Sequence, residues 1–234
     1  MPTWLILAKS PLFRFALTLL LLGLLRLAFH SLVEMNAAVR RASDRRIPYF
    51  RIIGETISWT LPVLHIHRTR RLYSFASISF HLGILAAGLF LGNHIDILQA
   101  NFGLAWFSVG KPVLDILTLL TLASGSFLFI HRIYNSSSRK LSKTMDYLLL
   151  ALILNIFLSG YLGGQAWNPI PYDSLMLFHT INGILLLALI PFTKIAHCVL
   201  YPLIRLGTEI AWHFPAQGGC EVVKSLHGPD GRRI

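Results

Sequence analysis

Long runs of apolar residues, separated by short polar segments, dominate the chain. A helix needs about 20 apolar residues to cross the hydrocarbon core of a bilayer. Five windows of that length carry few charges, and they cover residues 12–33, 74–95, 112–131, 145–164 and 175–204. The pattern therefore predicts an all-α integral membrane protein, a five-helix bundle whose membrane domain covers residues 1–205, followed by a short tail over 206–234.

The composition agrees with a membrane location. Of 234 residues, 54% are hydrophobic and only 13% are charged, and a soluble domain of this length could not bury so much apolar surface. Cys198 and Cys220 are the only cysteines, and no CxxC motif occurs, which argues against a cysteine-ligated zinc or iron–sulfur site within this chain. Any cofactor must therefore use other ligands.

Lysine and arginine lie mainly after the first and third spans and in the tail, whereas the opposite side has only Lys9 and Lys111. Short loops rich in these residues stay in the cytoplasm. We therefore expect the N-terminus outside and the C-terminus in the cytoplasm. The net charge of +11 then reflects topology and contact with anionic lipid headgroups, and it gives no reason to expect nucleic acid.

The segment 34–73 is too polar to span a membrane, yet it alternates aromatic and basic residues. We interpret it as a first cytoplasmic loop with an interfacial helix, docked on the bilayer or on a partner subunit. Its Tyr49, Phe50, Trp59 and arginines are of the types that are enriched in protein interfaces. An amphipathic helix lying on lipid is the alternative.

Four of the ten histidines lie in or at the ends of the second and fifth spans: His81, His94, His179 and His197. In the expected topology these spans run antiparallel, which pairs His81 with His197 on the cytoplasmic side and His94 with His179 on the outer side. A haem clamped between two helices needs one neutral imidazole from each. The sequence therefore predicts two haems with these four histidines as ligands of the haem iron.

Helix geometry supports one half of this arrangement better than the other. His179 and His197 are 18 residues apart, which is five whole turns, so an ideal helix places them on one face about 27 Å apart. His81 and His94 are 13 residues apart, and a rotation of about 220° separates them on a straight helix. Glycines in the second span and Pro191 in the fifth permit kinks that would change these relations.

The histidines lie in recognisable motifs. Residues 178–203, FHTINGILLLALIPFTKIAHCVLYPL, have a histidine near each end, a central PFTK and a proline after the second histidine. FHLGIL (80–85), LGNH (91–94) and DYLLLALILNIFLSGYLG (146–163) complete the pattern. Over about residues 75–205 the chain resembles the gamma, cytochrome b, subunit of membrane-bound respiratory nitrate reductase and its relatives. The resemblance implies two haem b groups, bound by the four histidines, in a bacterial inner membrane.

Three features are closer to another branch of these proteins: the long spacing from His81 to His94, the long loop before it, and the NFGLAWFSVG turn (101–110). They resemble cytochrome b subunits of transmembrane redox complexes in sulfate- and sulfur-metabolising bacteria, which sit beside iron–sulfur proteins and multihaem cytochromes c. The resemblance thus implies the electron-transfer subunit of a quinol-linked oxidoreductase complex. Its partners would be a cytoplasmic iron–sulfur subunit, a multihaem cytochrome c on the outer side, and quinone.

Charged residues at the rims extend this interpretation. Candidates for contacts to haem propionates at the inner rim are Arg70, Arg71 and Lys194, with interfacial anchoring as the alternative. On the outer side, Lys111 and Asp115 are candidates for a quinone pocket near His94. A haem-free membrane anchor and a histidine-lined metal transporter are the competing functions, although a transporter would normally need carboxylates within its spans.

Overall fold

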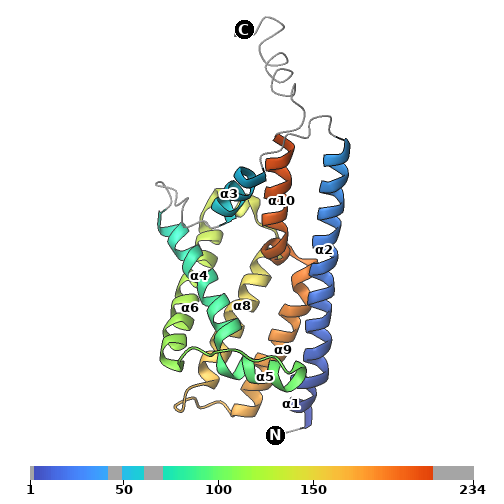
Figure 1. Ribbon diagram of the computed structural model, residues 1–234. Helices are drawn as coiled ribbons and strands as arrows, with labels where there is room; N and C mark the ends of the chain where they lie inside the picture. The colour runs from blue at the N-terminus through green and yellow to red at the C-terminus, as the bar shows by residue number, and fades with distance from the viewer. Residues whose placement is uncertain (1–2, 42–48, 61–70, 213–234) are drawn as a thin grey trace, which may run out of the picture. The chain divides into compact units, whose positions relative to one another are not determined.

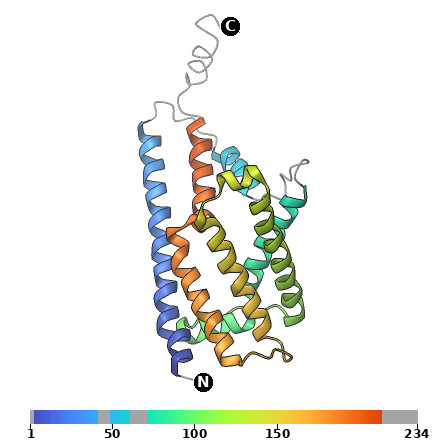
Figure 2. The same ribbon diagram turned by 180° about the vertical axis from the view of Figure 1, so that it is seen from behind.

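The computed structural model describes residues 3–41, 49–60 and 71–212, which are mainly helical (Figures 1 and 2). No strand occurs in these ranges, so the predicted all-α class is confirmed. The chain divides into two compact units. The first unit consists of Met1–Leu21 and Ile66–Lys194, and the second of Leu22–His65 and Ile195–Ile234.

Five helical stretches in the described ranges are long and apolar enough to cross a membrane. They are Thr3–Ala37, Arg71–Phe90, Lys111–Tyr134, Thr144–Gly163 and Tyr172–Phe192. The predicted spans fall on these five stretches, although their ends differ. The protein is therefore a multi-pass helical membrane protein.

The first unit contains most of the helices. They are α1 (Thr3–Leu7), the π-helical turn η1 (Ala8–Leu12), the start of α2 (Phe13–Arg41), α4 (Arg71–Phe90), α5 (Gly92–Phe102), α6 (Lys111–Tyr134), α7 (Ser136–Leu141), α8 (Thr144–Gly163) and α9 (Tyr172–Leu189). Helix α4 packs on α6, α6 on α8, and α8 on α9. Helix α5 lies across the end of α4 (Figure 1).

Helices α4 and α6 approach each other closely through a glycine. Gly83 of α4 faces Thr121 of α6, and a Cβ at position 83 would overlap the Thr121 side chain. Thr121 is fully buried, and its hydroxyl donates to the Leu117 carbonyl at 2.6 Å. Because lipid offers little hydrophobic driving force between helices, such close backbone packing is a main source of association in membranes.

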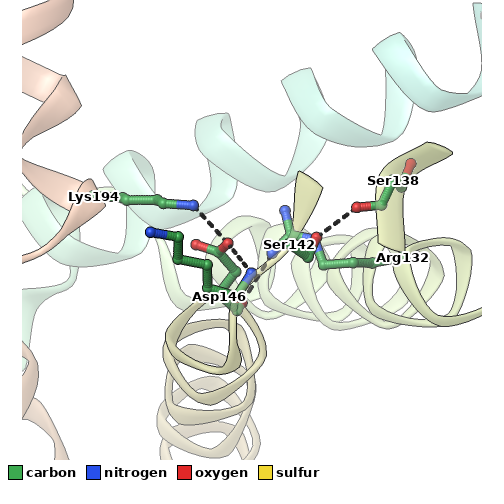
Figure 3. Close-up of polar contacts among 6 residues, drawn as sticks. Arg132, Ser138, Ser142, Asp146 and Lys194 are labelled. Atoms are coloured by element: carbon green, nitrogen blue, oxygen red, sulfur yellow. Dashed lines mark hydrogen bonds and ion pairs between the residues drawn. The ribbon is translucent and has the colours of Figure 1, made fainter. Parts of the chain in front are cut away.

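A polar cluster in the first unit joins the end of α6 and the start of α8 to Lys194, which follows α9 (Figure 3). Asp146, near the start of α8, accepts from the Lys194 ammonium at 2.6 Å and from the Lys143 backbone N–H at 2.8 Å, both through Oδ2. Arg132 of α6 donates to the Asp146 carbonyl at 2.9 Å. These contacts fix the turn that follows α9 against the start of α8.

The second unit contains the rest of α2 together with α3 (Tyr49–Thr60) and α10 (His197–Trp212). Ile52 of α3 and Ile210 of α10 form its buried centre, and Met35, Val39 and Leu206 pack against them. The helix expected within segment 34–73 is thus present as α3. The described helices also show that α2 extends to Arg41, beyond the predicted end of the first span.

Two predicted spans are interrupted where the sequence suggested continuous helix. The second span ends at Phe90, because Leu91 has extended backbone angles (φ −76°, ψ 124°) before α5 begins. The fifth ends at Phe192 and not near 204, because Pro191 cannot continue the helical hydrogen bonding and Thr193 is extended. The 3₁₀ turns η4 (Ile190–Phe192) and η5 (Lys194–Ala196) follow α9. The straight-helix geometry between His81 and His94, and between His179 and His197, therefore does not apply, because neither pair lies on one continuous helix.

The close contact at Gly83 generates a prediction about stability. We expect Gly83→Ala to destabilise the protein by about 1–3 kcal/mol, because the added methyl group must push α4 away from α6. Gly88→Ala is the matched control, since a Cβ there meets nothing within 4 Å. Thermal unfolding of both variants in the same detergent measures the difference. An equal or higher midpoint for Gly83→Ala than for Gly88→Ala would contradict the packing.

Candidate functional site

Two imidazole rings meet in the first unit. His94 of α5 and His179 of α9 have ring centroids 6.1 Å apart, and their planes differ by only 13°. These are the two histidines that the sequence paired on the outer side. The structure therefore brings together the residues of that pair, and their role as iron ligands stays a prediction.

His94 reaches this position because α4 ends early. The last four carbonyls of a helix lack donors within it, and here two of them accept from side chains of α5 and of the following loop. The His94 Nδ1 donates to the Ala87 carbonyl at 2.9 Å, and the Trp106 indole donates to the Leu89 carbonyl at 2.7 Å. The extended residue Leu91 turns the chain so that both contacts form.

His179 is held by α8. Its Nδ1 lies 3.0 Å from the Ile156 carbonyl and 3.3 Å from the Ser159 hydroxyl. Gly160 makes this approach possible, since a Cβ there would lie 2.8 Å from Cε1 of His179. The absence of a side chain at position 160 thus opens the surface of α8 to the imidazole.

The hydrogen bonds also determine which nitrogen of each ring is available. A carbonyl oxygen only accepts, so Nδ1 carries the proton in both His94 and His179. The lone pair of each neutral imidazole is then on Nε2. Burial lowers the pKa of His94 below its usual value, which keeps this ring neutral near pH 7. Metal-binding histidines are typically oriented in this way, by a hydrogen bond from the other ring nitrogen.

The separation of the rings fits a six-coordinate haem iron. Two metal–nitrogen bonds of about 2 Å each, with the distances from nitrogen to ring centre, give a centroid separation of about 6 Å; the observed value is 6.1 Å. Two imidazoles complete the coordination of haem iron, whereas a bare zinc ion needs three or four protein ligands. In the part of the chain that the structure describes, no group of three or more His, Cys, Asp or Glu side chains gathers.

The other predicted pair is divided between the two units. His81 lies on α4, and its Nδ1 donates to the Ser77 carbonyl at 2.7 Å, which also leaves Nε2 as the lone-pair nitrogen. Its ring stands edge-on to Phe80, with centroids 5.8 Å apart. His197 begins α10 of the second unit. The pairing of His81 with His197 stays a prediction.

The two lysines among the charged rim candidates form ion pairs with carboxylates. Lys194 forms its ion pair with Asp146, and Lys111 forms one with Asp115 at 2.6 Å, one turn along α6. Arg71 is exposed at the start of α4, and Arg70 lies outside the described residues. Roles in propionate or quinone binding stay predictions. A pocket of about 400 Å³ adjoins Lys194, and its other lining residues are Met145, Leu149, Phe192 and Thr193.

Sequence reasoning missed the groups that orient His179. Gly160 and Ser159 lie in the stretch LSGYLGG (158–164), where no motif separates them from other small residues of an apolar span. Their role depends on which face of α8 meets α9, and a nearly uniform apolar helix does not reveal that face. The one available signal was a small residue, Gly160, in the span that precedes the histidine-bearing α9.

Comparison with known proteins establishes a relationship. A protein of Nitratidesulfovibrio vulgaris (strain Hildenborough) is 30% identical to this chain over 184 residues, which cover 78% of this chain and 75% of that protein. The chain belongs to that protein's family. No protein-family model matches the chain, and no solved structure matches it.

Gly160 generates a prediction that leaves both histidines in place. We expect Gly160→Ala to displace the His179 ring. For the haem predicted between the two imidazoles, the expected loss of affinity is on the order of 10-fold, as at metal sites that lose an orienting contact. Gly207→Ala, a helical glycine with open space around its Cβ position, is the control. Haem content after purification measures the effect, and equal content in the two variants would show that the contact at Gly160 does not matter.

Proposed function

We propose that the chain is a dihaem cytochrome b, the membrane subunit of a respiratory redox complex that passes electrons between the quinone pool and an iron–sulfur or cytochrome c partner. The observation that carries this proposal is the His94–His179 pair, with its 6.1 Å ring separation and its two Nδ1–H groups committed to carbonyls. The resemblance to the nitrate reductase gamma subunit and its relatives supports the same function.

When bound, haem supplies one-electron oxidation and reduction. The protein residues supply ligands and orientation. His94 and His179 present Nε2 from two different helices, and the carbonyls of Ala87 and Ile156 prevent the rings from rotating. Gly160 leaves room for the His179 ring. Because backbone contacts hold the two rings, their orientation should change little when an electron is gained or lost. A small change in geometry suits an electron carrier.

A second haem, bound by His81 and His197, completes the proposal. It is supported by the sequence pattern and by the His81 hydrogen bond to Ser77, which prepares Nε2 in the same way as at the first pair. Two haems near opposite membrane faces would carry electrons across the low-dielectric layer, which the ordinary side chains of this chain do not do.

We place the protein in a bacterial inner membrane with the N-terminus outside and the C-terminus in the cytoplasm. In the first unit, the basic residues gather where α6, α7 and α8 connect: Arg132, Arg139, Lys140 and Lys143. Lys9 and Lys111 are the two lysines near the opposite helix ends. This distribution supports a cytoplasmic position for the α6–α8 connection. The His94–His179 pair then lies toward the outer face.

A metal transporter is the weaker alternative. Two histidines without a carboxylate partner are a poor site for a bare divalent ion. Asp146, an acidic residue at the end of a span, is already paired with Lys194. A haem-free anchor leaves unexplained why two imidazoles would each be oriented by a separate carbonyl.

The exposed apolar side chains of α3 favour a partner subunit on the cytoplasmic side. It buries Ile52 on one face, yet its other faces expose further apolar side chains: Tyr49, Phe50, Ile53 and Ile57. Phe50 is 95% exposed. An exposed apolar stripe of this kind marks contact with a protein or a lipid surface. We propose that the iron–sulfur partner docks on this exposed face of α3. Trp59, which the sequence also indicated for this contact, has a side chain outside the described residues.

Histidine substitution tests the haem assignment directly. We expect His94→Ala and His179→Ala each to remove the same one of two haems, because each deletes one of the two histidines that would hold that haem. His30→Ala is the control, since His30 contacts Glu34 on the exposed side of α2. A pyridine haemochrome assay and low-temperature optical spectra measure the outcome. Less than one haem per wild-type chain, or an unchanged spectrum in either variant, would refute the assignment.

The docking role of α3 is tested by surface substitution. We expect Phe50→Ala combined with Ile53→Ala to release an iron–sulfur subunit from the solubilised complex while both haem signals remain, because these side chains are exposed and contribute little to the core of the second unit. Phe15→Ala on α2 is the control for loss of an exposed aromatic ring. Retention of the partner in the double variant would leave lipid contact as the role of this face.

A further inference from the structure

The segment that precedes α2 joins the two helices of the histidine pair. Its α1 and η1 pack against α9, which carries His179, and η1 also contacts α5, which carries His94. Asn101 of α5 fixes this arrangement, since its amide donates to the Lys9 carbonyl at 3.0 Å. The Asn101 carbonyl oxygen accepts from Nε of Arg14 at 2.8 Å. The Lys9 backbone is therefore tied to α5, the helix that carries His94.

The local conformation of this segment is unusual. Residues Ala8–Leu12 form a π-helical turn that contains Pro11. Proline has no N–H and disturbs regular α-helical hydrogen bonding, and single π turns of this kind occur frequently at functional sites. The turn brings the Lys9 carbonyl within reach of the Asn101 amide. Its geometry thus determines where the Lys9 side chain begins.

The Lys9 side chain extends from the turn η1, which contacts both α5 and α9. The side chain is half-buried, and no carboxylate of the described residues lies within ion-pair distance of it. By contrast, Lys111 and Lys194 each have a carboxylate partner at 2.6 Å. A positive charge carried by a turn that packs against both helices of the histidine pair calls for an anionic group beside it.

We propose that Lys9 is the counter-charge of the haem held by His94 and His179, and that it raises the reduction potential of that haem. This inference rests on the proposed function. Uptake of one electron, delivered from quinol, adds one negative charge at the site without a bond being made or broken. A fixed cation nearby stabilises the more negative, reduced form over the oxidised form, and low dielectric strengthens this preference.

The experiment is a spectroelectrochemical titration of the full-length purified protein, with the outer haem identified as the signal lost in His94→Ala. We expect Lys9→Gln to shift the one-electron reduction equilibrium of that haem about tenfold toward the oxidised form, which corresponds to about 59 mV. Lys9→Arg keeps the charge and should keep the potential. Lys140→Gln, at the opposite helix ends, should leave the outer haem unchanged.

Asn101→Leu provides a second variant, because it frees the turn while the lysine remains. Its outer haem should shift in the same direction, because the turn that carries Lys9 is no longer tied to α5. Loss of the outer haem from Lys9→Gln but not from Lys9→Arg supports the same role. An unchanged potential in Lys9→Gln overturns the inference and leaves the proposed function standing, whereas a wild-type protein without haem overturns both.

Discussion

Every backbone carbonyl that a membrane helix leaves unpaired must find a donor within the protein, because hydrocarbon offers none. At the end of α4 this requirement is met by side chains and by the loop that follows. His94 donates to Ala87, Trp106 donates to Leu89, and the Val109 N–H donates to the Phe90 carbonyl at 3.0 Å. The carbonyl groups that the break at Leu91 frees are therefore hydrogen-bonded. The break also directs α5 across the end of α4 toward α9.

The same carbonyl contacts prepare the site chemically. A ring nitrogen that donates to a carbonyl fixes the rotation of the imidazole and leaves its other nitrogen as a ligand. At His179 the carbonyl comes from the middle of α8, where Gly160 leaves it accessible. One interaction type thus ends a helix on one side of the pair and orients the His179 ring on the other. Asn101 extends the arrangement to the N-terminal turn, and so to Lys9.

The sequence predicted what depends on apolar length and charge. The five spans, the helix within segment 34–73 and the proximity of His94 to His179 follow from those features. The helix breaks at Leu91 and Thr193 did not, because a break is stable only when distant donors such as Trp106 arrive, and their position is a tertiary property. The apparent rotation between His81 and His94 was an artefact of assuming a straight helix. The sequence did not predict the roles of Gly160 and Lys9, because these roles depend on how the helices pack and not on a sequence motif.

The central claim is that His94 and His179 bind one haem by themselves. The most direct test is the ferric and ferrous spectrum of the full-length protein in which His81 and His197 are both replaced by alanine, which removes the other proposed ligand pair. We expect one haem per chain with a low-spin, bis-imidazole spectrum, because the contacts of His94 to Ala87 and of His179 to Ile156 do not involve the replaced residues. A folded variant with no haem, or with a high-spin haem that lacks one axial imidazole, would contradict the claim.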